Sequence, residues 1–140
     1  MVERAIAAAK LNAATAQSTE VEESKAVSPL KIIAYDTDAD SVTIAKENAD
    51  LNGVGSQISF HVGSISEITP TFDFIYANLT IDVILPMLPL LIEKAVDTLV
   101  LSGILIEQEG TIVTALTDAG VSSFSIERSG EWIAVTISDR

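Results

Sequence analysis

From residue 31 onward, apolar strand-like runs alternate with runs of helical periodicity, and this alternation limits the fold more than any other feature. Residues 31–36 (KIIAYD) are apolar and rich in β-branched side chains, whereas residues 40–51 carry apolar side chains at helical spacing and end at Asn52-Gly53. Strands separated by helices form a right-handed, mostly parallel sheet with helices packed on its faces. The sequence therefore predicts an α/β fold.

The alternation continues to the end of the chain. The predicted strands are residues 58–62, 72–77 and 98–101, and the predicted helices are residues 81–95 and 108–119. Residues 122–128 and 131–138 then alternate in polarity around a Ser-Gly pair. This pattern is typical of an antiparallel hairpin, so the mostly parallel sheet is expected to finish with one antiparallel pair.

The first 30 residues have a different composition. Residues 1–16 are rich in alanine and predict a helix, because alanine loses no side-chain entropy on becoming helical. Residues 17–30 are polar and acidic, which predicts an exposed linker or insertion. Residues 31–140 then form the α/β domain, and the chain is expected to fold as a single domain overall.

Charge and residue content exclude several classes of function. The 140 residues include 20 acidic and 8 basic side chains, for a net charge of −12, with one histidine and no cysteine. Such a chain lacks the basic surface on which nucleic acids and anionic membranes depend. It also lacks the ligands of a zinc-thiolate or histidine-rich metal site. We expect a cytoplasmic protein with no metal, no membrane span and no nucleic-acid partner.

Polar residues directly after the predicted strands are the candidates for a site, because ligands of open parallel sheets bind at the carboxyl ends of strands. Asp36 ends the first of these strands, where a carboxylate can accept hydrogen bonds from both hydroxyls of a ribose. Two readings stay open here. The acid binds a nucleotide-type cofactor, or Asp36 or Asp38 only caps the helix that follows.

Gly63-Ser64 and Asn78-Leu79-Thr80 follow the next two strands. The glycine lets the backbone approach a ligand closely, although this position taken alone favours a simple turn. Asn78 offers two donors and an acceptor that suit an amine or a cofactor, and helix capping is its alternative role.

Three further positions are given structural roles. Ser102-Gly103 is expected to be a tight connection, since no histidine lies in a suitable context to activate the serine. His61 lies inside a predicted strand and is expected to be structural. Trp132 is expected to pack within the hairpin.

Four segments together carry a resemblance to a known family: KIIAYDTDADSVTIAKENADLNGV, FDFIYANLTIDVILPMLPLL, LVLSGILIEQ and SGEWIAVTI. In order and spacing they resemble the ribosomal protein L-eleven methyltransferase (PrmA) family, whose members are class I S-adenosylmethionine-dependent enzymes. The resemblance implies a Rossmann-like class I methyltransferase sheet. It also implies S-adenosylmethionine as cofactor and N-methylation of a ribosomal protein as the reaction.

The resemblance also implies residue roles. Asp36, with the adjacent Thr37, matches the position that binds the cofactor ribose. Asn78, with Leu79, matches the position at the methyl-transfer edge, where Asn78 is the expected catalytic residue. Gly63-Ser64 matches a pair near the adenine.

The front of the chain departs from the family pattern. The family has a central first strand that ends in a glycine-rich loop, whereas this chain has no glycine before Gly53. The sequence therefore predicts an N-terminally truncated domain, lacking the usual first strand of the 3-2-1-4-5-7-6 order and the cofactor loop. Buried strands without that partner would expose their edges, which favours self-association as a homodimer.

Three functions follow from these observations. The first is S-adenosylmethionine-dependent methylation of a ribosomal protein. The alternative is a catalytically inactive truncated fragment that acts as a binding or self-associating module. A nucleotide-dependent oxidoreductase is a third class, because an acid after a strand also serves NAD. It does not account for Asn78-Leu79-Thr80 or for the Ser-Gly-Ile-Leu segment that begins at Ser102.

Overall fold

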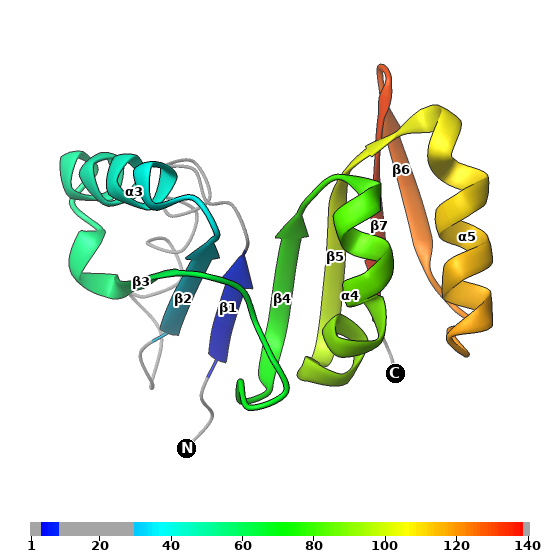
Figure 1. Cartoon of the computed structure of the whole chain (residues 1–140), viewed down its shortest axis with the longest axis horizontal. Coiled ribbons are helices and arrows are strands. Elements are labelled where there is room, and N and C mark those ends of the chain that lie inside the picture. The colour runs from blue at the N-terminus through cyan, green and yellow to red at the C-terminus, as the bar shows by residue number, and fades with distance from the viewer. Residues whose placement is uncertain (1–3, 9–29, 139–140) are drawn as a thin grey trace. The chain divides into compact units, whose positions relative to one another are not determined.

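The computed structural model describes residues 4–8 and 30–138 (Figure 1). These residues belong to two compact units, with the boundary between Ile65 and Ser66.

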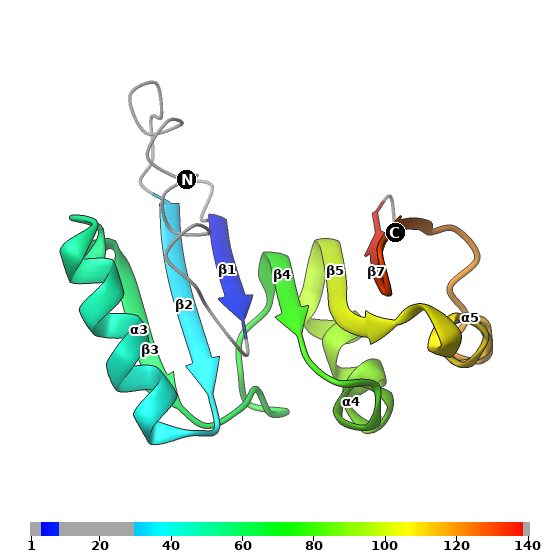
Figure 2. The same ribbon diagram turned by 90° about the horizontal axis from the view of Figure 1, so that it is seen from above.

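The described residues of unit 1 form a parallel sheet with a helix on one face. Its strands are β1 (Arg4–Ala8), β2 (Leu30–Asp36) and β3 (Ile58–Val62), in the order β3-β2-β1, and its helices are α3 (Ala39–Leu51) and the short 3₁₀ helix η1 (Gly55–Gln57). Helix α3 lies along one face of β2 and β3 (Figure 2). The apolar core under this helix is formed by Ile32, Ala34, Ala49, Val54 and Ile58, with Phe60 packed against them.

The helix that we predicted over residues 1–16 is wrong where the structure describes the chain. Residues Arg4–Ala8 form strand β1, which pairs in parallel with β2 in a register that sets Arg4 opposite Leu30 and Ala8 opposite Ala34. We also predicted that the first strand, the neighbour of residues 31–36 in the family's sheet, is missing. This prediction is wrong, because β1 pairs with β2 at that position. Residues 9–29, which include most of the predicted linker, lie outside the described residues.

Unit 2 combines a parallel pair of strands with an antiparallel hairpin. Its elements are β4 (Phe72–Asn78), α4 (Ile81–Lys94), β5 (Ala95–Leu105), the 3₁₀ helix η2 (Ile106–Gln108), α5 (Glu109–Asp118), β6 (Ser125–Ser129) and β7 (Trp132–Ile137). The strand order is β4-β5-β7-β6, in which β4 and β5 are parallel while β7 is antiparallel to both β5 and β6. The predicted α/β class and C-terminal hairpin are confirmed.

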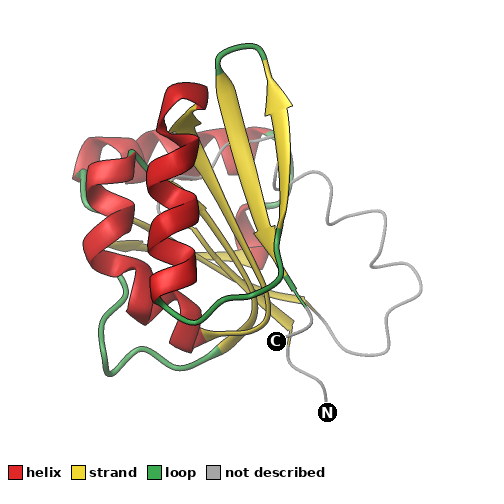
Figure 3. Ribbon diagram, turned by 90° about the vertical axis from the view of Figure 1, so that its right-hand side faces the viewer, coloured by secondary structure: helices red, strands yellow, loops and turns green. Residues whose placement is uncertain are grey.

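The two faces of the unit 2 sheet differ in burial. Helices α4 and α5 both lie on one face (Figure 3), where the strand residues are almost fully buried: Ile75, Leu99, Leu101, Ile104, Val135 and Ile137. Residues of the opposite face alternate with these and are only half-buried or exposed: Tyr76, Asn78, Val100, Ser102, Trp132, Ala134 and Thr136. The predicted site residue of β4, Asn78, therefore belongs to the face away from α4 and α5.

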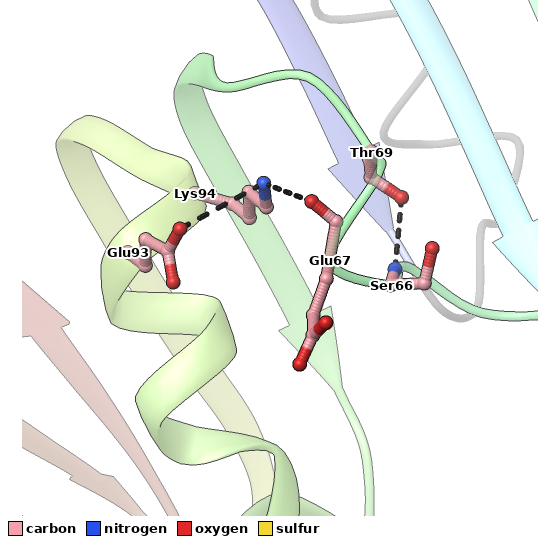
Figure 4. Close-up of polar contacts among 5 residues, drawn as sticks. All are labelled: Ser66, Glu67, Thr69, Glu93 and Lys94. Atoms are coloured by element: carbon pink, nitrogen blue, oxygen red, sulfur yellow. Dashed lines mark hydrogen bonds and ion pairs between the residues drawn. The ribbon is translucent and has the colours of Figure 1, made fainter.

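Lys94 ties the loop before β4 to the end of α4 (Figure 4). Only 6% of the surface of Lys94 is exposed, and the Lys94 Nζ donates a hydrogen bond to the backbone carbonyl of Glu67 at 2.9 Å. The loop itself closes through Ser66 and Thr69, because the Ser66 N–H donates to Thr69 Oγ1 at 2.8 Å and the Thr69 N–H donates to the Ser66 carbonyl at 3.0 Å. A cation in the last turn of a helix also interacts favourably with the helix dipole.

We expect Lys94→Met to lower the free energy of unfolding by about 1–3 kcal/mol, because it keeps the apolar stem but removes a buried charged donor from the Glu67 carbonyl. Lys46→Met, on the exposed side of α3, is the matched control and should change stability by less than about 0.5 kcal/mol. Urea denaturation followed by circular dichroism measures both. Equal stability of the two variants would contradict the anchoring role.

Candidate functional site

Two neighbouring carboxylates at the end of β2 have different roles. Asp38 is the N-cap of α3, since its Oδ1 accepts from the Asp40 N–H at 3.3 Å and its Oδ2 accepts from Ser41 Oγ at 2.8 Å. Asp36 is half-buried and accepts only the Asp38 N–H, at 2.9 Å on Oδ1, among the contacts of the described residues. Capping therefore belongs to Asp38, and the second oxygen of Asp36 remains available to a ligand.

Gly63 lies beside Asp36 at the same edge of unit 1. The Gly63 N–H donates to the Asp36 carbonyl at 2.7 Å, which extends the parallel ladder in which Asp36 is paired with Val62. Gly63 has a φ of +136°, and a Cβ built on it would find no heavy atom within 4 Å. The backbone conformation thus favours glycine, and the space next to it is open. The adjacent Ser64 and the Thr37 of the β2–α3 turn are both exposed.

A hollow of about 150 Å³ lies next to Asp36, between α3 and the β2–β3 face. Apolar side chains form most of its walls, and Asp36 and Ser41 supply polar groups at its margin. The full lining is Ala34, Tyr35, Asp36, Ser41, Val42, Ile44, Ala45 and Phe60. A mostly apolar wall with a few polar groups is typical of a small-molecule site.

His61 stacks on Tyr35, its register partner in β2, with ring centroids 5.4 Å apart and an interplanar angle of 27°. This contact agrees with the structural role that the sequence predicted for His61. The described part of the chain contains no group of three or more acidic, histidine or cysteine side chains that could hold a metal ion.

Asn78 ends β4 and is held by a chain of hydroxyl groups. Ser102 Oγ lies 3.2 Å from Asn78 Oδ1 and 3.0 Å from the hydroxyl of Tyr76. Ser102 has one proton, and the amide oxygen of Asn78 can only accept, so Ser102 donates to Asn78 and receives a hydrogen bond from Tyr76. The side chain of Asn78 is thereby oriented from its own sheet rather than from the helix that follows.

Helix capping is not the role of Asn78. The N-cap residue of α4 is Thr80, which makes no side-chain capping bond, whereas the Asn78 amide oxygen is bonded to Ser102. The next residue, Leu79, is half-buried, and its N–H donates to the Ser102 carbonyl at 3.0 Å. Asn78 and Leu79 are therefore both fixed against the same residue of β5.

Gly103 allows this arrangement. It has a φ of +86°, and a Cβ at this position would lie 2.6 Å from the Leu79 carbonyl oxygen and 2.7 Å from Asn78 Oδ1. The pairing of β5 with β7 shifts register between Leu101 and Ile104, which is a β-bulge at Ser102-Gly103. The sequence predicted only a tight connection here, and it did not indicate Tyr76. Tyr76 could have been found from its two-residue spacing to Asn78, because residues two apart in a strand lie on the same face.

The predicted site residues divide between the two units. Asp36, Thr37, Gly63 and Ser64 belong to unit 1, where the structure brings Asp36 and Gly63 together. Asn78 and Leu79 belong to unit 2, where the structure brings both against Ser102.

The family model for ribosomal protein L11 methyltransferase (PrmA) matches residues 4–140. The chain belongs to this family. It is 32% identical over 109 residues to the ribosomal protein L11 methyltransferase of Geotalea daltonii, covering 76% of this chain and 35% of that protein. It is 34% identical over 104 residues to the Geobacter sulfurreducens enzyme of the same name, covering 73% of this chain and 34% of that protein. The chain thus spans about a third of the length of the curated L11 methyltransferases it matches.

Solved structures agree on the fold. The crystal structure of the ribosomal protein L11 methylase from Lactobacillus delbrueckii subsp. bulgaricus matches with a TM-score of 0.76 and 28% identity, covering 99% of this chain and 71% of that chain. The N-terminal domain of human METTL16 in complex with SAH matches with a TM-score of 0.65 at 13% identity, which shows likeness of fold alone. The predicted class I methyltransferase fold is confirmed.

One further prediction from composition concerns membranes. Among the described residues, no helix has both the length and the apolar character that crossing a membrane requires.

Gly103→Ala should be more damaging than Gly120→Ala, although both glycines have nearly the same positive φ, +86° and +88°. Alanine at either position carries the cost of the left-handed conformation, about 1–2 kcal/mol. Only at Gly103 does the new Cβ clash with backbone and with Asn78, which should add about 1–3 kcal/mol. Denaturant unfolding of the two variants measures the difference, and equal losses would show that Gly103 is needed for its φ alone.

Proposed function

We propose that this chain carries the cofactor-binding and methyl-transfer residues of an S-adenosylmethionine-dependent methyltransferase that acts on amino groups of a ribosomal protein. The match of the family model over residues 4–140 supports the proposal most directly. The positions of Asp36 and Asn78 at the ends of β2 and β4 agree with it. The names of the relatives, ribosomal protein L11 methyltransferase, indicate L11 as the substrate.

The residues of unit 1 fit the adenosine end of such a cofactor. Asp36 has a carboxylate oxygen available to ribose hydroxyls, and the open space at Gly63 admits a ligand close to the backbone. The apolar hollow beside Asp36 offers a surface for an aromatic base. We assign Asp36 and Thr37 to the ribose, and Gly63 and Ser64 to the adenine side. The chain has no glycine before Gly53, so this fit concerns the adenosine end only.

The residues of unit 2 fit the placement of an amine. When bound, S-adenosylmethionine supplies an electrophilic methyl group on a positively charged sulfur. Asn78 Oδ1 keeps one lone pair beyond its bond from Ser102, so it can accept a hydrogen bond from an amine and fix the direction of the nitrogen lone pair. We assign Asn78 as the catalytic residue, with Leu79 beside it. Orientation of this kind contributes to rate without a covalent intermediate.

The chemical character of the partner, the location of the protein and its self-association stay predictions. The acidic balance of the chain suits a basic ribosomal protein, and it disfavours direct binding to nucleic acid. A cytoplasmic location agrees with such a substrate. Self-association as a homodimer also stays a prediction, although β1 fills the side of β2 whose exposure we expected to drive it.

Asp36→Asn should weaken the affinity for S-adenosylmethionine at least about tenfold, because a charged acceptor of ribose hydrogen bonds contributes about 1.5–3 kcal/mol. Asp38→Asn is the matched control, since the same chemical change two residues away affects the cap of α3 and not the proposed ligand contact. Equilibrium dialysis with labelled cofactor gives both dissociation constants. Equal affinities of the two variants would contradict the ribose role of Asp36.

Asn78→Ala should lower kcat for methyl transfer to L11 by about 100-fold or more, since the oriented acceptor is lost. The dissociation constant of S-adenosylmethionine should change less than threefold. Transfer of a labelled methyl group to purified L11 measures the first quantity, and dialysis the second. An Asn78→Ala variant with full activity would remove Asn78 from the mechanism.

A further inference from the structure

Trp132 is an exposed aromatic residue on the site face of unit 2. It begins β7, and 49% of its surface is exposed, although the sequence predicted a packing residue. Within β7, Ile133, Val135 and Ile137 are buried toward α4 and α5, so Trp132 lies on the opposite face by the alternation of the strand. That is also the face of Asn78 and its hydroxyl chain.

The strand register sets Trp132 at a defined separation from Asn78. Asn78 pairs with Ser102, and Ala134 lies across from the Ser102-Gly103 bulge, so Asn78 and Ala134 are two strand spacings apart. Trp132 precedes Ala134 by two residues in β7. It lies nearer the end of the sheet where β4 finishes and where the β6–β7 turn lies (Figure 1). Standard strand dimensions put the two backbone positions about 12 Å apart. An extended peptide crosses that distance in about four residues.

A carboxylate accompanies Trp132 on this face. Ser129 pairs with Trp132 and Glu127 pairs with Ala134, so Glu127 is the diagonal cross-strand neighbour of Trp132. Glu127 is exposed, and its carboxylate has no hydrogen bond or ion pair among the described residues. The tryptophan ring and this carboxylate thus share one exposed corner of the sheet.

The cations among the described residues of unit 2 are already engaged elsewhere. Residues 66–138 contain ten carboxylate side chains against two cationic ones, Lys94 and Arg128. Lys94 is buried against the Glu67 carbonyl. Arg128 points to the face that carries α5, where its Nε and Nη2 donate to the two carboxylate oxygens of Glu109 at 2.9 and 2.5 Å. This hydrogen bonding raises the pKa of Arg128 above its ordinary value. The described part of the unit therefore leaves no cation of its own for the Trp132 corner.

We propose that Trp132 and Glu127 form a docking site for a cationic side chain of the substrate protein, about four residues from the amine that is methylated. The ring face attracts an arginine or lysine by cation–π interaction, and the carboxylate accepts its N–H groups. The charge balance of the unit favours this occupant over an acidic or neutral one. The inference rests on the proposed function, and it adds a recognition element for the sequence around the acceptor.

Trp132 is the only tryptophan of the chain, so its emission reports directly on this corner. The probe is an alanine-based peptide with an arginine four residues from a lysine, and the control peptide has glutamine in place of the arginine. Titration of the 140-residue chain with the first peptide should change the emission in a salt-dependent way. The glutamine peptide should bind at least fivefold more weakly.

Two matched variants test the assignment. Glu127→Gln should weaken binding of the arginine peptide about threefold to tenfold, whereas Asp97→Asn, an exposed acid on β5 far along the sheet, should leave it unchanged. Circular dichroism checks that both variants are folded. Equal weakening by the two variants would overturn the proposal in favour of general attraction to an acidic chain.

The absence of any emission change with either peptide at millimolar concentration would also overturn the docking site. Binding of S-adenosylmethionine, measured on the same preparations, separates this result from a failure of the proposed function. Retained cofactor binding without peptide binding removes only the docking site. Loss of both removes the proposed function as well.

Discussion

Parallel pairing of strands is the constraint that places the candidate site residues within each unit. In a parallel pair the carboxyl ends lie at the same edge, so the residues that follow two neighbouring strands become neighbours in space. In unit 1 this brings Gly63 to Asp36, with the Gly63 N–H bonded to the Asp36 carbonyl at 2.7 Å. In unit 2 the same pairing sets Asn78 opposite Ser102. The polar residues after the strands thus gain their partners from the sheet.

Each unit adds one local feature to this constraint. At the end of β2, Asp38 caps α3, whereas the second carboxylate oxygen of Asp36 makes no hydrogen bond within the described part of the chain. At the end of β4, the β-bulge at Ser102-Gly103 places the Ser102 hydroxyl and the Gly103 backbone, which has no side chain, against Asn78. Bulges are enriched next to functional sites because they re-aim side chains. Both features hold a polar side chain of the candidate site in a defined position.

The fold could be predicted from residue 30 onward because pattern and tertiary environment agree there. The apolar runs of β2, β3 and β4 lie within a residue or two of their predicted bounds, and Asn52-Gly53 ends α3 as expected. Strand β5 is longer than predicted, since Asp97 and Ser102-Gly103 flank the apolar run of residues 98–101 and weaken the strand signal on both sides. The alanine-rich start failed for another reason. Helix propensity differs among residues by under about 1 kcal/mol, so pairing with β2 overrides it at Arg4–Ala8.

The sequence placed the candidate residues at strand ends but did not give their contacts. Asp36, Gly63 and Asn78 were chosen because ligands of open parallel sheets bind at the carboxyl ends of strands, and their binding roles stay predictions. The division of roles between Asp36 and Asp38 needed the hydrogen bonds, and the clash that a side chain at Gly103 would cause needed coordinates. Trp132 was wrongly expected to pack, because a strand pattern does not say whether a second layer covers each face.

If the residues at the strand ends hold the adenosine end of S-adenosylmethionine, the unaltered 140-residue chain binds this cofactor by itself. Calorimetric titration of that chain with S-adenosylmethionine measures the binding. We expect saturable heat with one ligand per chain. Absence of heat at millimolar ligand, from a chain that circular dichroism shows to be folded, would contradict it.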